Sequence, residues 1–250
     1  MDSHHHDIIR LAWSRQLGLP DSAFRPGSRH THPNPDATSV TFVRLGDSSV
    51  LVGAAEMLEI AGRHTDSELA GRGFLEGLVR QPRSGGAAAT HSSVPTVLSF
   101  ASDVGTTIDR HDPLISHELS HVLALEAMCA RDEVDAADLT RKRSWFTLLG
   151  DDRPADSATP LSAAAYLEWG GVLADVGVLT APEARRQGNA QVVGRLATND
   201  AFDEGMVPQW RARADNGTAR RLAARLGFQE WGVVVTVDHS LPAPGENYVG

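Results

Sequence analysis

The sequence predicts an α/β (α+β) protein, and three observations support this fold class. Strand-like and helix-like segments alternate over the last third of the chain, an order typical of a sheet covered by helices. Short apolar runs before residue 101 indicate further strands. The 250 residues, 41% of them hydrophobic, are enough to bury one large core or two small ones.

Apolar runs and turn residues predict the elements of the first hundred residues. In chain order we expect a helical piece at 7–17, strands at 38–45 and 48–53, a helix at 54–62, a second helix from Thr65, and a strand at 96–101. Gly46-Asp47 is typical of a hairpin turn, and Thr65 with Glu68 has the spacing of a capping box. The start of the chain is expected to be disordered or on the surface, and 81–95 to be a linker.

The middle of the chain predicts a long helix and a strand. Asp112-Pro113 is a favourable helix start, because Asp caps the first turn and Pro fits the first helical position. We expect this helix to run to about Arg131, followed by an acidic patch at 132–138 and a strand at 143–149. A polar, turn-rich break is expected at 151–160.

From residue 163 onward, predicted strands and helices follow one another closely. Strands are predicted at 163–169 and 172–179 with Gly170-Gly171 between them, then a helix at 189–204, a strand at 207–213, a helix at 216–226 and a strand at 230–237.

Charge and cysteine content argue against several classes of partner. The net charge is -9, whereas nucleic-acid binding needs clustered Lys and Arg, so no nucleic acid is expected. No apolar run has the length that crosses a bilayer, so no membrane partner is expected. Cys129 is the one cysteine, which fits a cytoplasmic location, and its apolar surroundings predict a buried, inert thiol.

A turn in the stretch 174–196 carries the clearest chemistry. Apolar strand residues lead into Arg185-Arg186-Gln187-Gly188-Asn189-Ala190, where a helix is expected to begin. A helix N-terminus presents unpaired N–H groups and the positive end of its dipole, and Gly188 lets a ligand approach the backbone closely. Two arginines add charge-assisted donors. The turn therefore predicts a site for a pyrophosphate, although it lacks both the Walker and the GxGxxG patterns.

Arg185-x-x-Gly188-x-Ala190 after a strand resembles motif A of the GNAT superfamily of N-acetyltransferases. Asn216-Gly217-Thr218-Ala219, with Leu226-Gly227-Phe228 after it, resembles that superfamily's next helix. The resemblance covers roughly 163–237. It implies a mixed, mostly antiparallel central sheet flanked by helices, in a core at 141–250 that binds acetyl-CoA as co-substrate. Residues 1–140 would then form an elaborated, variable acceptor-side region.

The resemblance also implies roles for individual residues. The pantetheine arm would lie along the strand at Val178, Leu179 and Thr180, and a backbone N–H near Leu179 would stabilise the developing oxyanion. Residues 185–190 would hold the pyrophosphate, and Asn216 would contact the pantetheine or the acetyl end.

An attacking amine must lose a proton, so a carboxylate is expected as general base. Asp175 and Glu168 are the two candidates on the predicted strands, and Asp175 shares a strand face with Gly177 and Leu179. The position where many family members carry an acid tyrosine is Ala223 here. The general acid is then water, Tyr166, or no dedicated group.

His117-Glu118-Leu119-Ser120-His121 is a competing motif. The H-E-x-x-H spacing on a helix is typical of zinc hydrolases, but no third ligand follows at the expected spacings, and no metal is expected.

As a whole the chain is similar to aminoglycoside 2'-N-acetyltransferases of the kasugamycin-inactivating type. That resemblance implies a small cationic acceptor and a role in antibiotic resistance, with Glu118, Glu133 and Tyr166 as expected acceptor contacts. Another small amine or polyamine, a non-catalytic acetyl-CoA sensor and a homodimer stay open.

Overall fold

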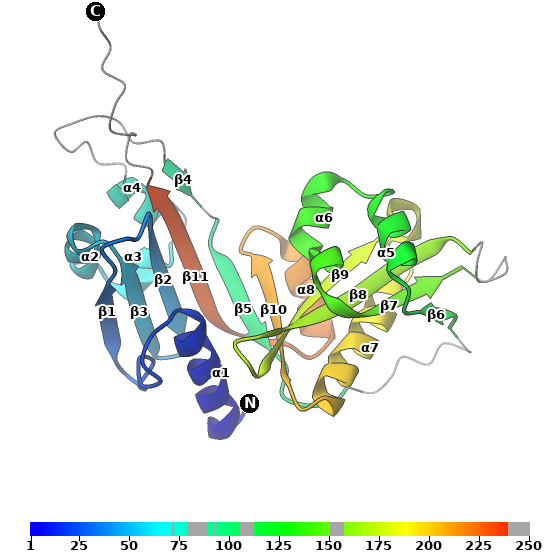
Figure 1. The fold of residues 1–250 in the computed structure, drawn as a ribbon, viewed down its shortest axis with the longest axis horizontal. Coiled ribbons are helices and arrows are strands. Elements are labelled where there is room, and N and C mark those ends of the chain that lie inside the picture. The colour runs from blue at the N-terminus through cyan, green and yellow to red at the C-terminus, as the bar shows by residue number, and fades with distance from the viewer. Residues whose placement is uncertain (72, 80–89, 93, 106–112, 151–157, 240–250) are drawn as a thin grey trace, which may run out of the picture. The chain divides into compact units, whose positions relative to one another are not determined.

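The structure is a computed structural model that describes residues 1–71, 73–79, 90–92, 94–105, 113–150 and 158–239 (Figure 1). Its helices are α1 (Ser3–Gln16), α2 (Ala55–Gly62), α3 (Asp66–Leu69), α4 (Phe74–Val79), α5 (Leu119–Glu126), α6 (Arg131–Ala137), α7 (Asn189–Asp203) and α8 (Gly217–Arg225), with 3-10 turns η1 (Leu139–Arg141) and η3 (Pro182–Ala184). Its strands are β1 (Arg29–Pro33), β2 (Ser39–Leu45), β3 (Ser48–Gly53), β4 (Thr90–Ser92), β5 (Thr96–Phe100), β6 (Ile115–Ser116), β7 (Arg143–Leu149), β8 (Pro160–Trp169), β9 (Leu173–Thr180), β10 (Val207–Arg213) and β11 (Gln229–His239).

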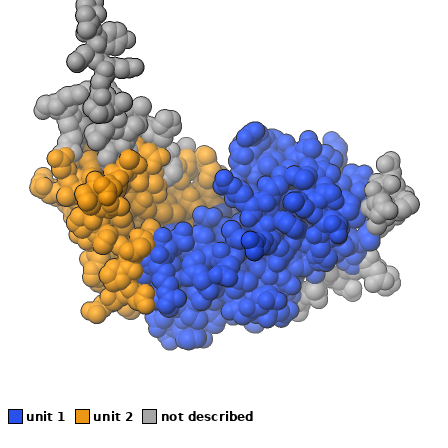
Figure 2. All heavy atoms as spheres, viewed as in Figure 1, with its two compact units in different colours: residues 1–16, 99–211, 216–230 blue, residues 17–98, 212–215, 231–250 orange. Residues whose placement is uncertain are grey.

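The chain divides into two compact units, coloured separately in Figure 2. Unit 1 contains residues 1–16, 99–211 and 216–230, and unit 2 contains residues 17–98, 212–215 and 231–250. This division follows contacts in space and differs from the predicted boundary at 140/141, which concerns acceptor and cofactor roles and stays a prediction.

The strands confirm the predicted mixed, mostly antiparallel sheet flanked by helices. In unit 2, β2 pairs antiparallel with β3 and with β11, while β1 pairs parallel with β3. In unit 1, β6, β7, β8 and β9 pair antiparallel in that order, and β10 adds to β9 in parallel.

Helices cover both faces of the unit 1 strands (Figure 1). Alternate residues of a strand point to opposite faces. Ala163 and Ala165 of β8 and Leu179 of β9 pack in one apolar cluster with Val122 and Leu125 of α5. Tyr166, on the other face of β8, bonds to Asp200 of α7. The site therefore lies on a sheet that α7 covers on one side and α5 and α6 on the other.

Unit 2 has an apolar core of its own. Val40, Phe42 and Leu51 from the β2–β3 hairpin pack against Met57 and Leu58 of α2 in one buried cluster. The hairpin turn at Gly46 has φ +59, a left-handed conformation that glycine adopts without strain. The predicted hairpin is therefore confirmed.

Most predicted elements are confirmed, among them the capping box of Thr65 and Glu68. The long helix predicted at 112–131 is wrong. Asp112 lies outside the described residues, β6 pairs Ile115 with Leu148, and helix begins only at Leu119. The side chain of Ser116 accepts the Glu118 N–H at 3.1 Å, which satisfies that donor outside a helix.

The start of the chain is exposed at residues 2–4, as the surface alternative predicted, but it is helical and not disordered. Helix α1 begins at Ser3, and Asp2 accepts the backbone N–H of His5 at 2.9 Å, as a capping side chain does. The predicted linker and the predicted break at 151–160 fall largely on residues outside the described ranges. Among the described helices, none combines the length and apolarity needed to cross a bilayer.

Candidate functional site

Strand β9 has an open edge at its carboxyl end. Its pairing with β10 runs from Leu173 opposite Val207 to Val176 opposite Trp210. Its other edge pairs with β8 all the way to Thr180. In the described pairings, Gly177–Thr180 therefore have a partner strand on one side only, and the second edge can bind an extended ligand by main-chain hydrogen bonds. The predicted cofactor residues Val178, Leu179 and Thr180 lie on this segment.

The turn after β9 forms an anion-binding geometry at the start of α7. Gly188 is the N-cap residue with φ +84, and a Cβ there would meet no atom within 4 Å. Arg186, with φ +62, also has a left-handed backbone. No side chain caps α7, so the first N–H groups, at Asn189 and Ala190, have no helical acceptor. These donors and the helix dipole fit a phosphate.

Buried and exposed side chains complete the turn. Asn189 is buried, donates to the Ala184 carbonyl at 2.8 Å, and has an Oδ1 without a hydrogen-bond partner. Gln187 donates to the Glu183 carbonyl at 3.1 Å. Arg186 is exposed and makes no ion pair with a described residue. The turn and the open edge together fit the diphosphate and the extended arm of acetyl-CoA.

Arg185 and Glu133 join two parts of the predicted site. The Arg185 guanidinium donates to the Glu133 carboxylate at 2.8 Å, and its Nε donates to the Thr180 carbonyl at 3.3 Å. A predicted cofactor residue is thus paired with a predicted acceptor residue, and helix α6 is brought beside the turn.

Asp175 lies in a buried ion cluster. Arg211 donates to Oδ1 at 2.7 Å and to Oδ2 at 2.8 Å, and Lys142 Nζ donates to Oδ2 at 2.6 Å. Burial tends to raise the pKa of Asp175, but Arg211 and Lys142 outweigh it and hold that pKa below its ordinary value. A carboxylate with both oxygens paired and a lowered pKa is a weak base.

Glu168 has a different setting. It is exposed on β8 opposite Ala174, and by strand parity it shares the face of Tyr166 rather than that of Asp175. The two predicted catalytic carboxylates are therefore on opposite faces of the sheet. No described residue forms an ion pair with the Glu168 carboxylate.

Tyr166 and Asn216 already have intramolecular partners. The Tyr166 hydroxyl donates to Asp200 at 2.6 Å, and burial, followed by Asp200, raises the pKa of Tyr166 to about 12. Asn216 caps α8, accepting the Ala219 N–H at 3.0 Å. Ala223, at the position of the family's tyrosine, is 1% exposed and packed inside.

The HELSH segment does not have the geometry of a zinc-protease helix. His117 precedes the helix and contacts the Trp145 carbonyl at 2.7 Å through Nδ1. His121 contacts the Ser116 hydroxyl at 2.7 Å. Glu118 is exposed at the N-cap of α5. Within the described ranges, no three His, Cys, Asp or Glu side chains gather as metal ligands would.

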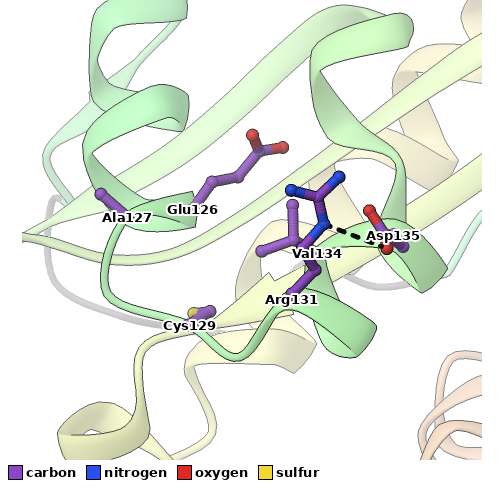
Figure 3. Close-up of a pocket in the computed structure, with 6 residues that line it drawn as sticks. All are labelled: Glu126, Ala127, Cys129, Arg131, Val134 and Asp135. Atoms are coloured by element: carbon purple, nitrogen blue, oxygen red, sulfur yellow. Dashed lines mark ion pairs between the residues drawn. The ribbon is translucent and has the colours of Figure 1, made fainter.

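A pocket of about 420 Å³ lies where α5 meets α6 (Figure 3). Glu126 stands at the end of α5, and Arg131 and Asp135 of α6 form an ion pair of 3.7 Å across from it. The Oε1 of Glu126 is buried without a hydrogen-bond partner, and burial raises the pKa of Glu126 despite an opposing hydrogen bond from the backbone of Thr140. A pocket carboxylate in that state suits proton transfer better than Asp175 does. Sequence reasoning missed it because it placed Glu126 inside one long helix.

Cys129 also lines this pocket, in the loop between α5 and α6. It is half-buried, and its Sγ lies 3.7 Å from the Thr180 carbonyl. Burial raises the pKa of the Cys129 thiol, which fits the predicted inert role. The contact places Cys129, one of the residues that line the pocket, beside Thr180 at the end of β9.

Residues 162–232 match a family model described as GNAT acetyltransferase. The match covers less than half of the chain. The GNAT segment runs from β8 into β11 and contains the open edge of β9, the turn, α7, β10 and α8. The match identifies an acetyltransferase domain and supports acetyl transfer in general.

Several solved structures are similar to the chain. A putative acetyltransferase of the GNAT family from Novosphingobium aromaticivorans is 22% identical with a TM-score of 0.47, over 61% of this chain and 68% of that one. A GNAT-family acetyltransferase from Colwellia psychrerythraea is 17% identical with a TM-score of 0.45, over 61% of this chain and 58% of that one. A GCN5-related N-acetyltransferase from Kribbella flavida is 19% identical with a TM-score of 0.42, over 62% of each chain. Curated protein sequences yield no match.

Proposed function

We propose that this chain is an acetyl-CoA-dependent N-acetyltransferase whose acceptor is a small cationic amine. One observation carries the proposal. The unpaired end of β9 leads directly into an uncapped helix N-terminus with a left-handed glycine, inside the segment that matches the GNAT family. Such a geometry binds an extended chain and a diphosphate in one continuous path.

The pocket beside β9 supports a cationic acceptor. Glu126 lines that pocket and carries a buried carboxylate oxygen without a hydrogen-bond partner among the described residues, and the net charge of -9 favours approach of a cation. An aminoglycoside of the kasugamycin type is the first acceptor to test, as the overall resemblance implies, and its acetylation would confer resistance. Glu118 and Glu133 stay proposed acceptor contacts. We also propose a cytoplasmic location.

Glu126 is the carboxylate whose surroundings best suit the general base. Its raised pKa and unpaired oxygen contrast with the paired oxygens of Asp175. Glu126→Gln should lower kcat/KM about a hundredfold, since a positioned base contributes at least that much. Asp132→Asn, on the exposed side of α6, is the matched control. Equal losses in both variants would remove Glu126 from the mechanism.

The direct test mixes the purified full chain with acetyl-CoA and a panel of amines. The panel holds kasugamycin, deoxystreptamine aminoglycosides, spermidine and free amino acids, and the readouts are released thiol and the mass of the product. Acetylation of kasugamycin or another aminoglycoside supports the proposal in full. Acetylation of spermidine or an amino acid alone overturns the aminoglycoside assignment.

An acetyl-CoA sensor is the second candidate. Ala223 replaces the family's acid tyrosine, and the Tyr166 hydroxyl is committed to Asp200, so the described part of the site offers no phenol to the reaction. Acetyl-CoA binding without thiol release for any amine would favour the sensor over the enzyme.

A further inference from the structure

Arg211 stands where β9 and β10 stop pairing. The last paired residues are Val176 and Trp210, and Arg211 is the next residue of β10. Asp175, one position before Val176, holds its guanidinium by two hydrogen bonds. The guanidinium is therefore fixed at the inner end of the open β9 edge, opposite in direction from the anion-binding turn.

The cluster around Arg211 carries a net positive charge. Lys142 and Arg211 supply two cations and Asp175 supplies one carboxylate, so a charge of about +1 is left in a cluster whose Lys142 and Asp175 are buried. Asp138 is the other charged group that acts on Arg211, and it has its own partner in Arg141 at 3.8 Å. Lys142 is 5% exposed, whereas Arg211 is 43% exposed and its Nη1 donates to no described residue.

The open edge of β9 connects the anion-binding turn at one end with the Arg211 guanidinium at the other. Gly177–Thr180 span about 13 Å at roughly 3.3 Å per residue. A ligand with its phosphates at the start of α7 and its arm along this edge would reach the strand junction with its far end. In acetyl-CoA that end is the thioester.

Negative charge must appear on the thioester sulfur of acetyl-CoA during acetyl transfer. The amine nitrogen bonds to the carbonyl carbon, the carbon–sulfur bond breaks, and its electron pair stays on sulfur, while the proton of the amine leaves to a carboxylate or water. A tyrosine acid is missing at Ala223, so a fixed cation is the alternative way to stabilise the sulfur.

We propose that Arg211, positioned by Asp175 and reinforced by the buried ammonium of Lys142, stabilises the CoA thiolate that leaves when the acetyl group is transferred. The inference rests on the proposed function and adds a residue to it. Arg211 touches the sulfur, whereas Asp175 acts through Arg211 as a positioning residue.

The test is a pH titration of CoA bound to the full chain, followed by the ultraviolet absorbance of its thiolate. Bound desulfo-CoA provides the background. A cation within a few ångströms should lower the pKa of the bound thiol by about 1 unit or more relative to free CoA. Arg211→Gln should return that pKa to the value of free CoA, and Arg211→Lys should retain part of the shift. Arg143→Gln, an exposed arginine of the same unit, should keep the wild-type value.

Two results would overturn the inference. One is a pKa of the bound CoA thiol that is unshifted in the wild-type complex, and this measurement does not depend on the folding of any variant. The other is a wild-type shift that persists in folded Arg211→Gln. Failure of CoA to bind the wild-type chain at all contradicts the proposed function, so the two failures are distinguishable.

Discussion

The Asp175 carboxylate accepts both a side-on pair of hydrogen bonds from Arg211 and a third from Lys142. Asp175 belongs to β9, Arg211 to β10, and Lys142 follows η1, so one buried side chain ties three elements together. Gly177 makes this possible, because a Cβ there would lie 2.8 Å from the Lys142 Cε and would clash with the Ala137 carbonyl oxygen.

Asp175→Asn should destabilise the protein by about 3 to 5 kcal/mol, because the buried ammonium of Lys142 loses its charged partner and the half-exposed Arg211 loses both of its hydrogen bonds. Chemical unfolding in urea measures the difference. Asp203→Asn, an exposed aspartate at the end of α7, should change stability by less than about 0.5 kcal/mol. A similarly small effect of Asp175→Asn would contradict a stabilising ion cluster.

The stability that Asp175 contributes should depend on pH. Its pKa is lower in the folded chain than in the unfolded chain, so the contribution is fully present above about pH 4 and is lost as the pH falls through the folded pKa. The difference in unfolding free energy between wild type and Asp175→Asn should therefore shrink below pH 4. A difference that stays constant down to pH 2 would contradict the lowered pKa.

Gly188→Ala should weaken acetyl-CoA binding. Alanine at φ +84 strains the backbone by roughly 1 to 2 kcal/mol and distorts the donors at the start of α7. Gly205 is a matched control at the other end of α7, with φ +75 and equally open space. Both variants should lose similar stability in thermal unfolding, and calorimetry should show weaker binding for Gly188→Ala alone. Equal affinities in the two variants would remove the turn from the cofactor site.

Glu133→Gln should strengthen acetyl-CoA binding. The exposed ion pair holds Arg185 by about 0.2 to 1 kcal/mol, and releasing it lets the guanidinium turn to a phosphate. The expected gain in affinity is about two- to fivefold at low salt, from the same energy range. Asp132→Asn removes a neighbouring exposed charge without releasing Arg185 and should leave the affinity nearly unchanged. Weaker binding in Glu133→Gln would mean that the pair itself shapes the site.

The bounds of helices and strands follow from the sequence where local turn signals and apolar periodicity agree. The ends of β10 were predicted to the residue, and the end of α7 within one residue, because apolar spacing and the glycines at 188 and 205 mark these elements. Asp112-Pro113 is an equally good local signal, yet a strand comes first and helix begins only at Leu119, since pairing of Ile115 with Leu148 depends on residues far along the chain. The ion-pair partners of Asp175 could not be predicted for the same reason, because Lys142 and Arg211 lie 33 and 36 positions away in the sequence.

The indole of Trp13 donates to the Gln209 side chain at 2.9 Å across 196 positions of sequence, and Gln209 in turn lies 3.5 Å from Asp175. During synthesis α1 leaves the ribosome well before β10, because it precedes β10 in the chain. Unit 2 residues 17–98 are translated in between. Unit 1 therefore cannot complete its ion cluster until β10 has emerged, and until then the Trp13 indole N–H lacks the acceptor that Gln209 supplies.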